Sequence, residues 1–343
     1  MIPAAACIGA GRMGRGIAQA LAYGGGRIAL LDSRPRGADA FAAYRDDVLA
    51  EVQAGLEMVA RLGGFDADAV PALMARVSVH PLSDAARALG GAEIVYEAVP
   101  EIRAAKAEAF GLFDAHADAD AILASTTSTM LSTDLAALTS RPERFLNAHW
   151  LNPALLVPLV EVSPCDETLP DVTDRLCAVL EAMGKVPVLC KASPGYIVPR
   201  IQALAMNEAA RLVEEGVATP EDVDRAVKYG FGLRFSVLGL LEFIDWGGGD
   251  ILYHASRYMA DATGEDRFAP PAIVARHMEE GAIGMKSGRG FFDYAGRDVD
   301  AYRTDRMGAF LNALRQAGLF RQPALEDPAT TGTGQTATGS SQP

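Results

Sequence analysis

The sequence predicts an α/β domain built on a parallel β-sheet, followed by an all-α domain. In the first half, short apolar runs alternate with helical patterns, which is typical of a parallel sheet with helices on both faces. After residue 192 the apolar residues recur only at helical spacing. The 343 residues also exceed what one hydrophobic core usually serves, so two domains are expected.

The first half contains the expected strands and the helices that connect them. Helical patterns begin at Arg12 and near Ala38, pass through Lys106, and cover 171–185. The apolar runs that predict strands are shorter and are flanked by turn residues. They lie at 4–11, 27–32, 75–80, 92–99, 121–126, 144–150, 157–164 and 186–190.

The second half is expected to be helical from end to end. Thr219 precedes "PEDVDRAVKYG" and is a good N-cap for a helix. The other predicted helices cover 201–215, 235–246 and 249–264, and a last one follows Asp300. We therefore predict a first domain at 1–192 and a helical domain at 193–321. Residues 322–343 are rich in Gly, Thr, Ser and Pro, which predicts a disordered tail.

Composition excludes several classes of partner. Lys and Arg total 31 against 44 Asp and Glu, and a net charge of −13 repels nucleic acid and anionic membrane surfaces. No uncharged apolar run approaches the roughly 20 residues of a membrane span. The cysteines are widely spaced, which favours reduced thiols in a cytoplasmic protein and gives no metal site. They are Cys7, Cys165, Cys177 and Cys190.

A glycine pattern follows the first predicted strand and precedes the first predicted helix. Gly9, Gly11 and Gly14 have G-x-G-x-x-G spacing, and Arg12 and Met13 lie inside the motif. The three glycines suit a tight turn, a close approach of the backbone to a pyrophosphate, and close helix–strand packing. The motif in this context predicts a Rossmann-like domain that binds a dinucleotide through these residues.

Asp32 ends the second predicted strand, eighteen residues after Gly14. A carboxylate there can accept a hydrogen bond from the 2′-hydroxyl of the adenosine ribose, and it repels a 2′-phosphate. NAD is therefore expected rather than NADP. Arg34 and Arg36 follow closely and could receive such a phosphate, although arginines in such loops are more often solvated.

The run from Ala148 to Val162 is suited to burial but contains His149 and Glu161. Burying either side chain without a partner costs several kcal/mol, on the order of 3–5 kcal/mol for an unpaired charge. The two side chains are therefore expected to be partners. They are twelve residues apart on two strands joined by a proline-containing turn, a spacing that lets the strands pair. The pair is either a satisfied core contact or a catalytic base with its orienting carboxylate.

Five motifs in order resemble the L-3-hydroxyacyl-CoA dehydrogenase family over roughly residues 1–320. The resemblance implies a Rossmann-like NAD-binding domain followed by an all-α C-terminal domain that makes a homodimer interface. The motifs are "STTS" from Ser125, "HWLNP" from His149, "LVEV" from Leu159, "PGY" from Pro194 and "GMKSGRGFF" from Gly284.

The same resemblance implies roles for individual residues. His149 would be the general base and Glu161 its partner. Ser128 and Asn152 would hydrogen-bond the reacting oxygen of the substrate or its neighbouring carbonyl. Glu101 and Lys106, in "VPEIRAAK", match positions near the nicotinamide half of NAD.

Two departures from the family pattern concern the substrate. Pro199 stands before Arg200 where the family has an asparagine, so an amide that could contact the substrate is missing. The stretch 38–80, lysine-rich in the acyl-CoA enzymes, contains seven acidic residues and only three arginines, Arg45, Arg61 and Arg76. Such a surface is a poor match for the phosphates of CoA. The helical half looks closer to the branch with lambda-crystallin/L-gulonate dehydrogenase and carnitine dehydrogenase.

The expected function is NAD-dependent oxidation of a short-chain L-3-hydroxyacyl-CoA, such as 3-hydroxybutyryl-CoA, to the 3-oxoacyl-CoA. The first alternative is a dehydrogenase of a free 3-hydroxy acid or small alcohol, of the gulonate or carnitine type. A second alternative, from another class, is a non-catalytic NAD(H)-binding protein. It would need only the dinucleotide site.

Overall fold

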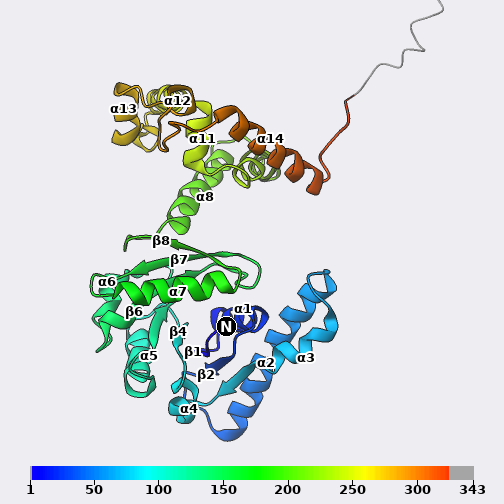
Figure 1. Cartoon of the computed structure of the whole chain (residues 1–343), viewed down its shortest axis with the longest axis vertical. Coiled ribbons are helices and arrows are strands. Elements are labelled where there is room, and N and C mark those ends of the chain that lie inside the picture. Colours follow the sequence, from blue (N-terminus) through cyan, green and yellow to red (C-terminus); the bar gives the residue numbers. More distant parts are fainter. Residues whose placement is uncertain (1, 324–343) are drawn as a thin grey trace, which may run out of the picture. The chain divides into compact units, whose positions relative to one another are not determined.

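The computed structural model describes residues 2–323, which form two compact units that divide after Asn207 (Figure 1). The first unit is α/β and the second is helical, as the sequence predicts. The α/β class with a helical C-terminal part is therefore confirmed. The predicted domain boundary after residue 192 stays a prediction. The predicted tail lies outside the described residues except for Gln322 and Pro323.

An eight-stranded sheet forms the centre of the first unit. Its strand order is β3-β2-β1-β4-β5-β6-β7-β8, and every neighbouring pair is parallel except β6 and β7. All eight predicted strands are present. They are β1 (Ala5–Ile8), β2 (Ile28–Leu31), β3 (Val77–His80), β4 (Ile94–Glu97), β5 (Ile122–Ser125), β6 (Phe145–Trp150), β7 (Leu159–Pro164) and β8 (Val186–Leu189).

Helices cover both faces of this sheet. They do so because successive apolar side chains of the inner strands point to opposite faces, and each face must be buried in a core of its own. Cys7 and Tyr96 point into one core, whereas Ile8 and Val95 point into the other. The first core is closed by α1 (Arg12–Gly24), α2 (Ala38–Arg61), α3 (Val70–Met74) and α7 (Pro170–Ala182). The second is closed by α4 (Ala85–Leu89), α5 (Arg103–His116) and α6 (Ser132–Ala136).

The carboxyl ends of the parallel strands meet at one edge of the sheet. β1 lies between β2 and β4, so the chain order reverses there, which is where open α/β sheets bind ligands. Asp32 follows β2, Glu97 ends β4, Ser125 ends β5 and His149 is the penultimate residue of β6. The topology therefore gathers polar side chains from distant segments at the edge that also carries the glycine motif.

The chain leaves the sheet through α8 (Val198–Glu214), which begins three residues before the predicted start at Ile201. In the second unit Thr219 is the N-cap of its helix, as predicted, with its hydroxyl oxygen accepting from the Asp222 N–H at 3.2 Å. The helices of that unit are α9 (Pro220–Ala226), α10 (Leu233–Phe235), α11 (Leu240–Gly247), α12 (Gly249–Thr263), α13 (Ala272–Glu279) and α14 (Val299–Gln316).

Three details of the second unit differ from the sequence prediction. The segment 235–246 is not one helix, because Gly239 ends the turn after Phe235 and caps α11. The eight-residue α13 follows two prolines and was not predicted. The last helix begins at Val299 rather than after Asp300, since the Asp298 side chain caps it. Short 3₁₀ or π segments lie at Ala67–Ala69, Leu82–Asp84, Pro142–Arg144, Val227–Gly232, Asp266–Phe268 and Met285–Ser287.

The "GMKSGRGFF" motif is explained by a buried carboxylate in α11. Asp245 is 2% exposed and accepts hydrogen bonds from the backbone N–H groups of Phe291 and Phe292 and from the Tyr294 hydroxyl. A Cβ at Gly290 would overlap this carboxylate. The loop around Gly290 therefore packs against Asp245, which binds its backbone N–H groups. Within residues 2–323, no helix is long and apolar enough to cross a membrane.

Candidate active site

The glycine turn has the shape that a bound dinucleotide requires. Gly9 has a φ of +105°, and a Cβ there would come within 2.7 Å of the Ala98 carbonyl oxygen. A Cβ at Gly14 would overlap the Gly9 carbonyl, so only glycine lets α1 pack this closely on β1. Beside Gly11 the space is open. These residues fit a pyrophosphate lying on the N-terminus of α1.

Asp32 is almost fully buried at the end of β2 and already holds an arginine. Its carboxylate accepts from Arg36 Nε at 2.6 Å and from the Arg34 backbone N–H at 3.2 Å. The Arg36 guanidinium also lies 4.1 Å from the centre of the Tyr44 ring. Arg36 is thus not merely a solvated loop residue. A ribose hydroxyl that approaches Asp32 meets a carboxylate flanked by a cation.

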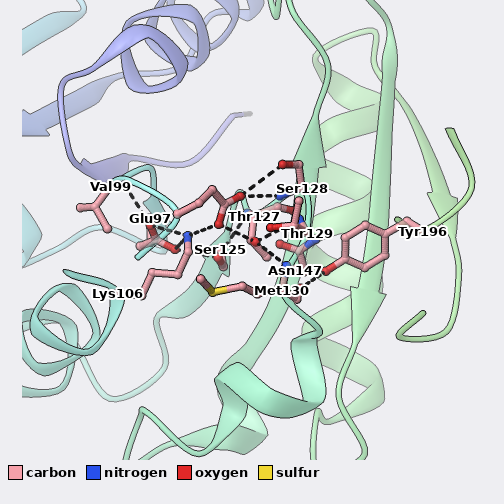
Figure 2. Close-up of polar contacts among 11 residues, drawn as sticks. Glu97, Val99, Lys106, Ser125, Thr127, Ser128, Thr129, Met130, Asn147 and Tyr196 are labelled. Carbon is pink, nitrogen blue, oxygen red and sulfur yellow. Dashed lines mark hydrogen bonds and ion pairs between the residues drawn. The ribbon is translucent and has the colours of Figure 1, made fainter. Parts of the chain in front are cut away.

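A buried ion pair anchors the middle of the site (Figure 2). Lys106 of α5 is 1% exposed, and its ammonium lies 3.0 and 3.1 Å from the two carboxylate oxygens of Glu97. Glu97 also accepts from the Ser125 hydroxyl at 2.6 Å and from the Val99 N–H at 2.9 Å. The sequence analysis missed Glu97. Its signal was an acid that ends a buried apolar strand and needs a partner.

Glu101 extends this network to the residues predicted to meet the substrate. Its carboxylate accepts from the Ser128 N–H at 2.7 Å and from the Thr127 hydroxyl at 2.8 Å, and it lies 3.4 Å from the Lys106 ammonium. Burial raises the pKa of Glu101, but the hydrogen bond from Ser128 and the charge of Lys106 outweigh it, so the pKa lies below its ordinary value. Glu101 is therefore an anion at neutral pH.

His149 and Glu161 face each other across the antiparallel strands β6 and β7. The Nδ1 atom of His149 is 2.7 Å from Oε2 of Glu161, which is fully buried. The other carboxylate oxygen accepts from the backbone N–H groups of Ile197 and Val198 at 2.9 and 2.7 Å. Two N–H donors at the start of a helix stabilise a carboxylate anion. Glu161 therefore joins the imidazole to the start of α8, which explains why that helix begins early.

Tyr196, in "PGY", covers the imidazole. The two rings are nearly parallel, with centroids 5.9 Å apart. Burial, with neighbouring acidic groups, raises the pKa of Tyr196, so its hydroxyl stays protonated and donates to the Met130 carbonyl at 2.7 Å. Tyr196 has a φ of +45°, in the left-handed region that non-glycine residues rarely adopt. These contacts hold it against His149, and the sequence analysis did not select it.

Lys185 fixes the loop after "HWLN". This lysine is 7% exposed, and its ammonium donates to the backbone carbonyls of Ala154, Leu155 and Val157 at 2.6, 3.1 and 2.9 Å. Burial lowers the pKa of Lys185, but the three carbonyl acceptors suit a cation. The lysine thereby holds the segment that follows Asn152. It too was missed, because nothing in a single lysine before a strand predicts three backbone partners.

A pocket of about 430 Å³ brings half of the predicted site residues together. Gln202 and Pro199, both of α8, line it as well, so Gln202 brings an amide to the pocket in which the family's asparagine is missing. Glu161, Lys106 and Gly14 do not line this pocket. Glu161 and Lys106 contact its wall residues His149 and Glu101 instead. The predicted residues in its wall are Arg12, Met13, Glu101, Ser128, His149 and Asn152.

A second pocket, of about 280 Å³, lies at the other end of the glycine turn. Its walls include Gly9, Gly11, Asp32, Arg36 and Tyr44. Ala98, Val99 and Pro100 line both pockets. An elongated dinucleotide therefore fits with its adenosine half near Asp32 and its nicotinamide half toward His149, with the glycine turn between them.

Two family models match the chain in succession. Residues 4–193 match the NAD-binding domain of 3-hydroxyacyl-CoA dehydrogenase, and residues 195–294 match its C-terminal domain. A probable 3-hydroxybutyryl-CoA dehydrogenase of Bacillus subtilis is 34% identical over 286 residues, which are 83% of this chain and 95% of that protein.

Two further relatives agree in coverage but differ in their stated substrates. The 5-formyl-3-hydroxy-2-methylpyridine 4-carboxylate 5-dehydrogenase of Mesorhizobium japonicum is 32% identical over 89% of this chain and 95% of its own. The crystal structure of the 3-hydroxyacyl-CoA dehydrogenase of Archaeoglobus fulgidus has a TM-score of 0.71 and 30% identity, covering 93% of this chain and 100% of that chain. This chain is therefore a member of the 3-hydroxyacyl-CoA dehydrogenase family, an NAD-dependent oxidoreductase that acts on CH–OH groups.

Proposed function

We propose that this enzyme oxidises the hydroxyl group of a short-chain L-3-hydroxyacyl-CoA to the 3-oxoacyl-CoA, or catalyses the reverse. The observation that carries the proposal is the buried His149–Glu161 pair in the wall of the pocket. Because Nδ1 is held by Glu161, the remaining nitrogen, Nε2, is the one that can accept a proton from a substrate hydroxyl. Glu161 stabilises the imidazolium that results and need not be protonated itself.

Other residues hold the reacting group. Asn152 is exposed in the pocket wall, and its amide can donate to the substrate oxygen or to the neighbouring carbonyl. The Ser128 hydroxyl now lies 3.3 Å from Glu101, a long contact from which it can rotate toward the substrate. Met13 and the anionic Glu101 border the place for the nicotinamide half, and Lys106 holds Glu101 from behind. The chemistry that NAD supplies when bound is acceptance of the hydride.

A free 3-hydroxy acid is the second candidate substrate, and the surface charges favour it. The arginines of the 38–80 stretch are largely engaged: Arg45 pairs with Asp46 at 2.8 Å, and Arg76 donates to the Ala22 carbonyl at 2.6 Å. Only Arg61, at the end of α2, has no described partner among residues 2–323. The name of the relative from Mesorhizobium states a substrate that carries a free carboxylate. The non-catalytic alternative has no such observation in its favour.

We further propose a cytoplasmic homodimer. The helices of the second unit leave several large apolar side chains exposed, as does α8, and apolar side chains on a surface are typical of a subunit interface. Sedimentation velocity distinguishes the 36.2 kDa chain from its dimer. The four cysteines are free thiols, which suits a reducing compartment. The exposed apolar residues include Leu204, Met206, Tyr229, Phe231, Ile251 and Tyr258.

A substrate panel tests the proposed reaction. NAD reduction is followed by NADH absorbance with L-3-hydroxybutyryl-CoA and with free L-3-hydroxy acids. If the CoA thioester is the substrate, its KM should rise with ionic strength, since exposed arginine–phosphate contacts are each worth about 1 kcal/mol and are screened by salt. A kcat/KM for a free acid well above the kcat/KM for the CoA thioester would reject the CoA assignment. No turnover of any 3-hydroxy substrate would reject the dehydrogenase role.

The His149–Glu161 pair is tested by two substitutions. His149→Ala should lower kcat by roughly 10²- to 10⁴-fold, the usual loss of a general base, and leave NADH binding nearly intact. Glu161→Gln should also lower kcat. Its amide NH₂ would face Nδ1, so the neutral imidazole would carry its proton on Nε2, the nitrogen that must accept the proton of the substrate.

The activity of this variant separates catalysis from packing. Glu161→Gln keeps the shape of the side chain and an oxygen for the backbone N–H groups of Ile197 and Val198, so a fold that merely needs the contact should tolerate it. A kcat equal to that of the unmodified enzyme would mean that the pair is only a core contact.

The structure makes the cofactor preference testable at Asp32 and Arg36. The unmodified enzyme should prefer NAD, because the Asp32 carboxylate repels a 2′-phosphate. Asp32→Ser should weaken NAD binding and raise the use of NADP by roughly 10-fold or more, since Arg36 loses its counter-charge and can bind the phosphate.

The double variant is the matched control for that prediction. Asp32→Ser combined with Arg36→Ala should lose the gain in NADP use while keeping the weaker NAD binding. If the unmodified enzyme uses NADPH as well as NADH, Arg36 outweighs Asp32 and the preference is not set by the carboxylate. Fluorescence titration of the three proteins with NADH and with NADPH measures the six binding constants.

A further inference from the structure

The side chain of Arg12 has no partner among the described residues. Arg12 is the first residue of α1 and is exposed, and its guanidinium makes no hydrogen bond or ion pair within residues 2–323. Arg15, three residues on, pairs with Asp47 at 2.9 Å and with Glu51, and donates to the Ala10 carbonyl. The helix thus uses one arginine for packing and leaves the other free.

The free arginine belongs to the pocket of His149 rather than to the pocket of Asp32. Arg12 lines the 430 Å³ pocket, whereas Arg15 lines the 280 Å³ pocket. Among the described residues in the wall of the His149 pocket, Arg12 is the only lysine or arginine. Glu101 is the only acid there, and its carboxylate is held by Ser128, Thr127 and Lys106 rather than by Arg12. A ligand in this pocket therefore meets an arginine that pairs with none of the described residues.

We propose that Arg12 binds the carboxylate of a free 3-hydroxy acid, the second candidate substrate. The inference rests on the proposed oxidation of a 3-hydroxy group and names the residue that would recognise the free acid. A guanidinium binds a carboxylate through two parallel N–H···O bonds, which a neutral thioester carbonyl cannot match. A net charge of −13 does not attract an anion, so the local cation at the pocket is what holds it.

Arg12 was assigned from the sequence to the cofactor, and the pyrophosphate of NAD is the competing partner. The glycine turn already offers that pyrophosphate the backbone N–H groups at the N-terminus of α1, where an anion is bound without any side chain. The two assignments differ in what a substitution changes. A pyrophosphate contact affects NADH binding and every substrate alike, whereas a carboxylate contact affects only substrates that carry the charge.

The test uses two substrates that differ at this one group. L-3-hydroxybutyrate carries the carboxylate, and its N-acetylcysteamine thioester is neutral and has no phosphates. Arg12→Gln should lower kcat/KM for the acid by roughly 10- to 100-fold, the value of a lost charge-assisted hydrogen bond, mainly through KM. The thioester and the NADH dissociation constant, measured by fluorescence, should change by less than about threefold.

Two variants serve as controls. Arg12→Lys keeps the charge but not the fork and should restore part of the acid's kcat/KM. Arg175→Gln removes an exposed arginine that pairs with Glu93 elsewhere in the first unit, and it should change neither substrate.

Three outcomes would overturn parts of this assignment. Weaker NADH binding together with equal losses for both substrates would assign Arg12 to the pyrophosphate. An unchanged kcat/KM for the acid would remove Arg12 from substrate binding altogether. If the unmodified enzyme binds NADH but turns over neither substrate, the proposed 3-hydroxy oxidation itself fails, and that result is obtained before any variant is made.

Discussion

The carboxylate of Glu161 is the constraint on which the site depends. One of its oxygens holds the His149 imidazole and the other holds the first N–H groups of α8. A buried anion is costly unless its hydrogen-bonding capacity is used, and here the three donors use it. The same interaction therefore fixes the tautomer of the imidazole and the place where α8 begins. It also brings Pro199 and Gln202 to the pocket.

A second buried network holds the residues on the cofactor side of the site in place, as Glu161 holds His149. Glu97 and Lys106 neutralise each other at the end of β4 (Figure 2). Glu101, in the wall of the pocket, adds a second carboxylate to this network. Because one ammonium faces two carboxylates, the network keeps a net negative charge, which Ser128 and Thr127 stabilise through hydrogen bonds. Residues from β4, α5 and the turn after β5 are thereby held in one arrangement before any ligand binds.

Charge divides the site into two ends. At the adenosine end, Arg36 pairs with Asp32 beside Tyr44. At the catalytic end, Glu101 lies beside Lys106, and the side chain of Arg12 has no partner among the described residues. Relatives within the family have different stated substrates, from 3-hydroxybutyryl-CoA to a pyridine carboxylate. A fold shared by relatives of this kind does not by itself name the substrate.

Local sequence determined the elements of this protein. Apolar periodicity and glycine spacing predicted all eight strands, the main helices of the first unit, the dinucleotide turn and Asp32. They did so because the backbone responds to near neighbours: a strand needs its apolar run, and a φ of +105° needs Gly9. The segments that failed were short ones, such as α13, in which eight residues give too few turns for a periodicity.

The partnerships between distant segments were decided only by the tertiary structure. Motif resemblance suggested that His149 and Glu161 meet, but Glu97, Tyr196, Lys185 and Gln202 were missed, and Arg36 was expected to be solvated. Each of these depends on groups that come together only when the sheet closes, such as the 28 residues between Glu97 and Ser125. A single buried charge in a sequence shows that a partner must exist, because burial without one is too costly. Which partner it finds is set by strand order and register, which no local pattern encodes.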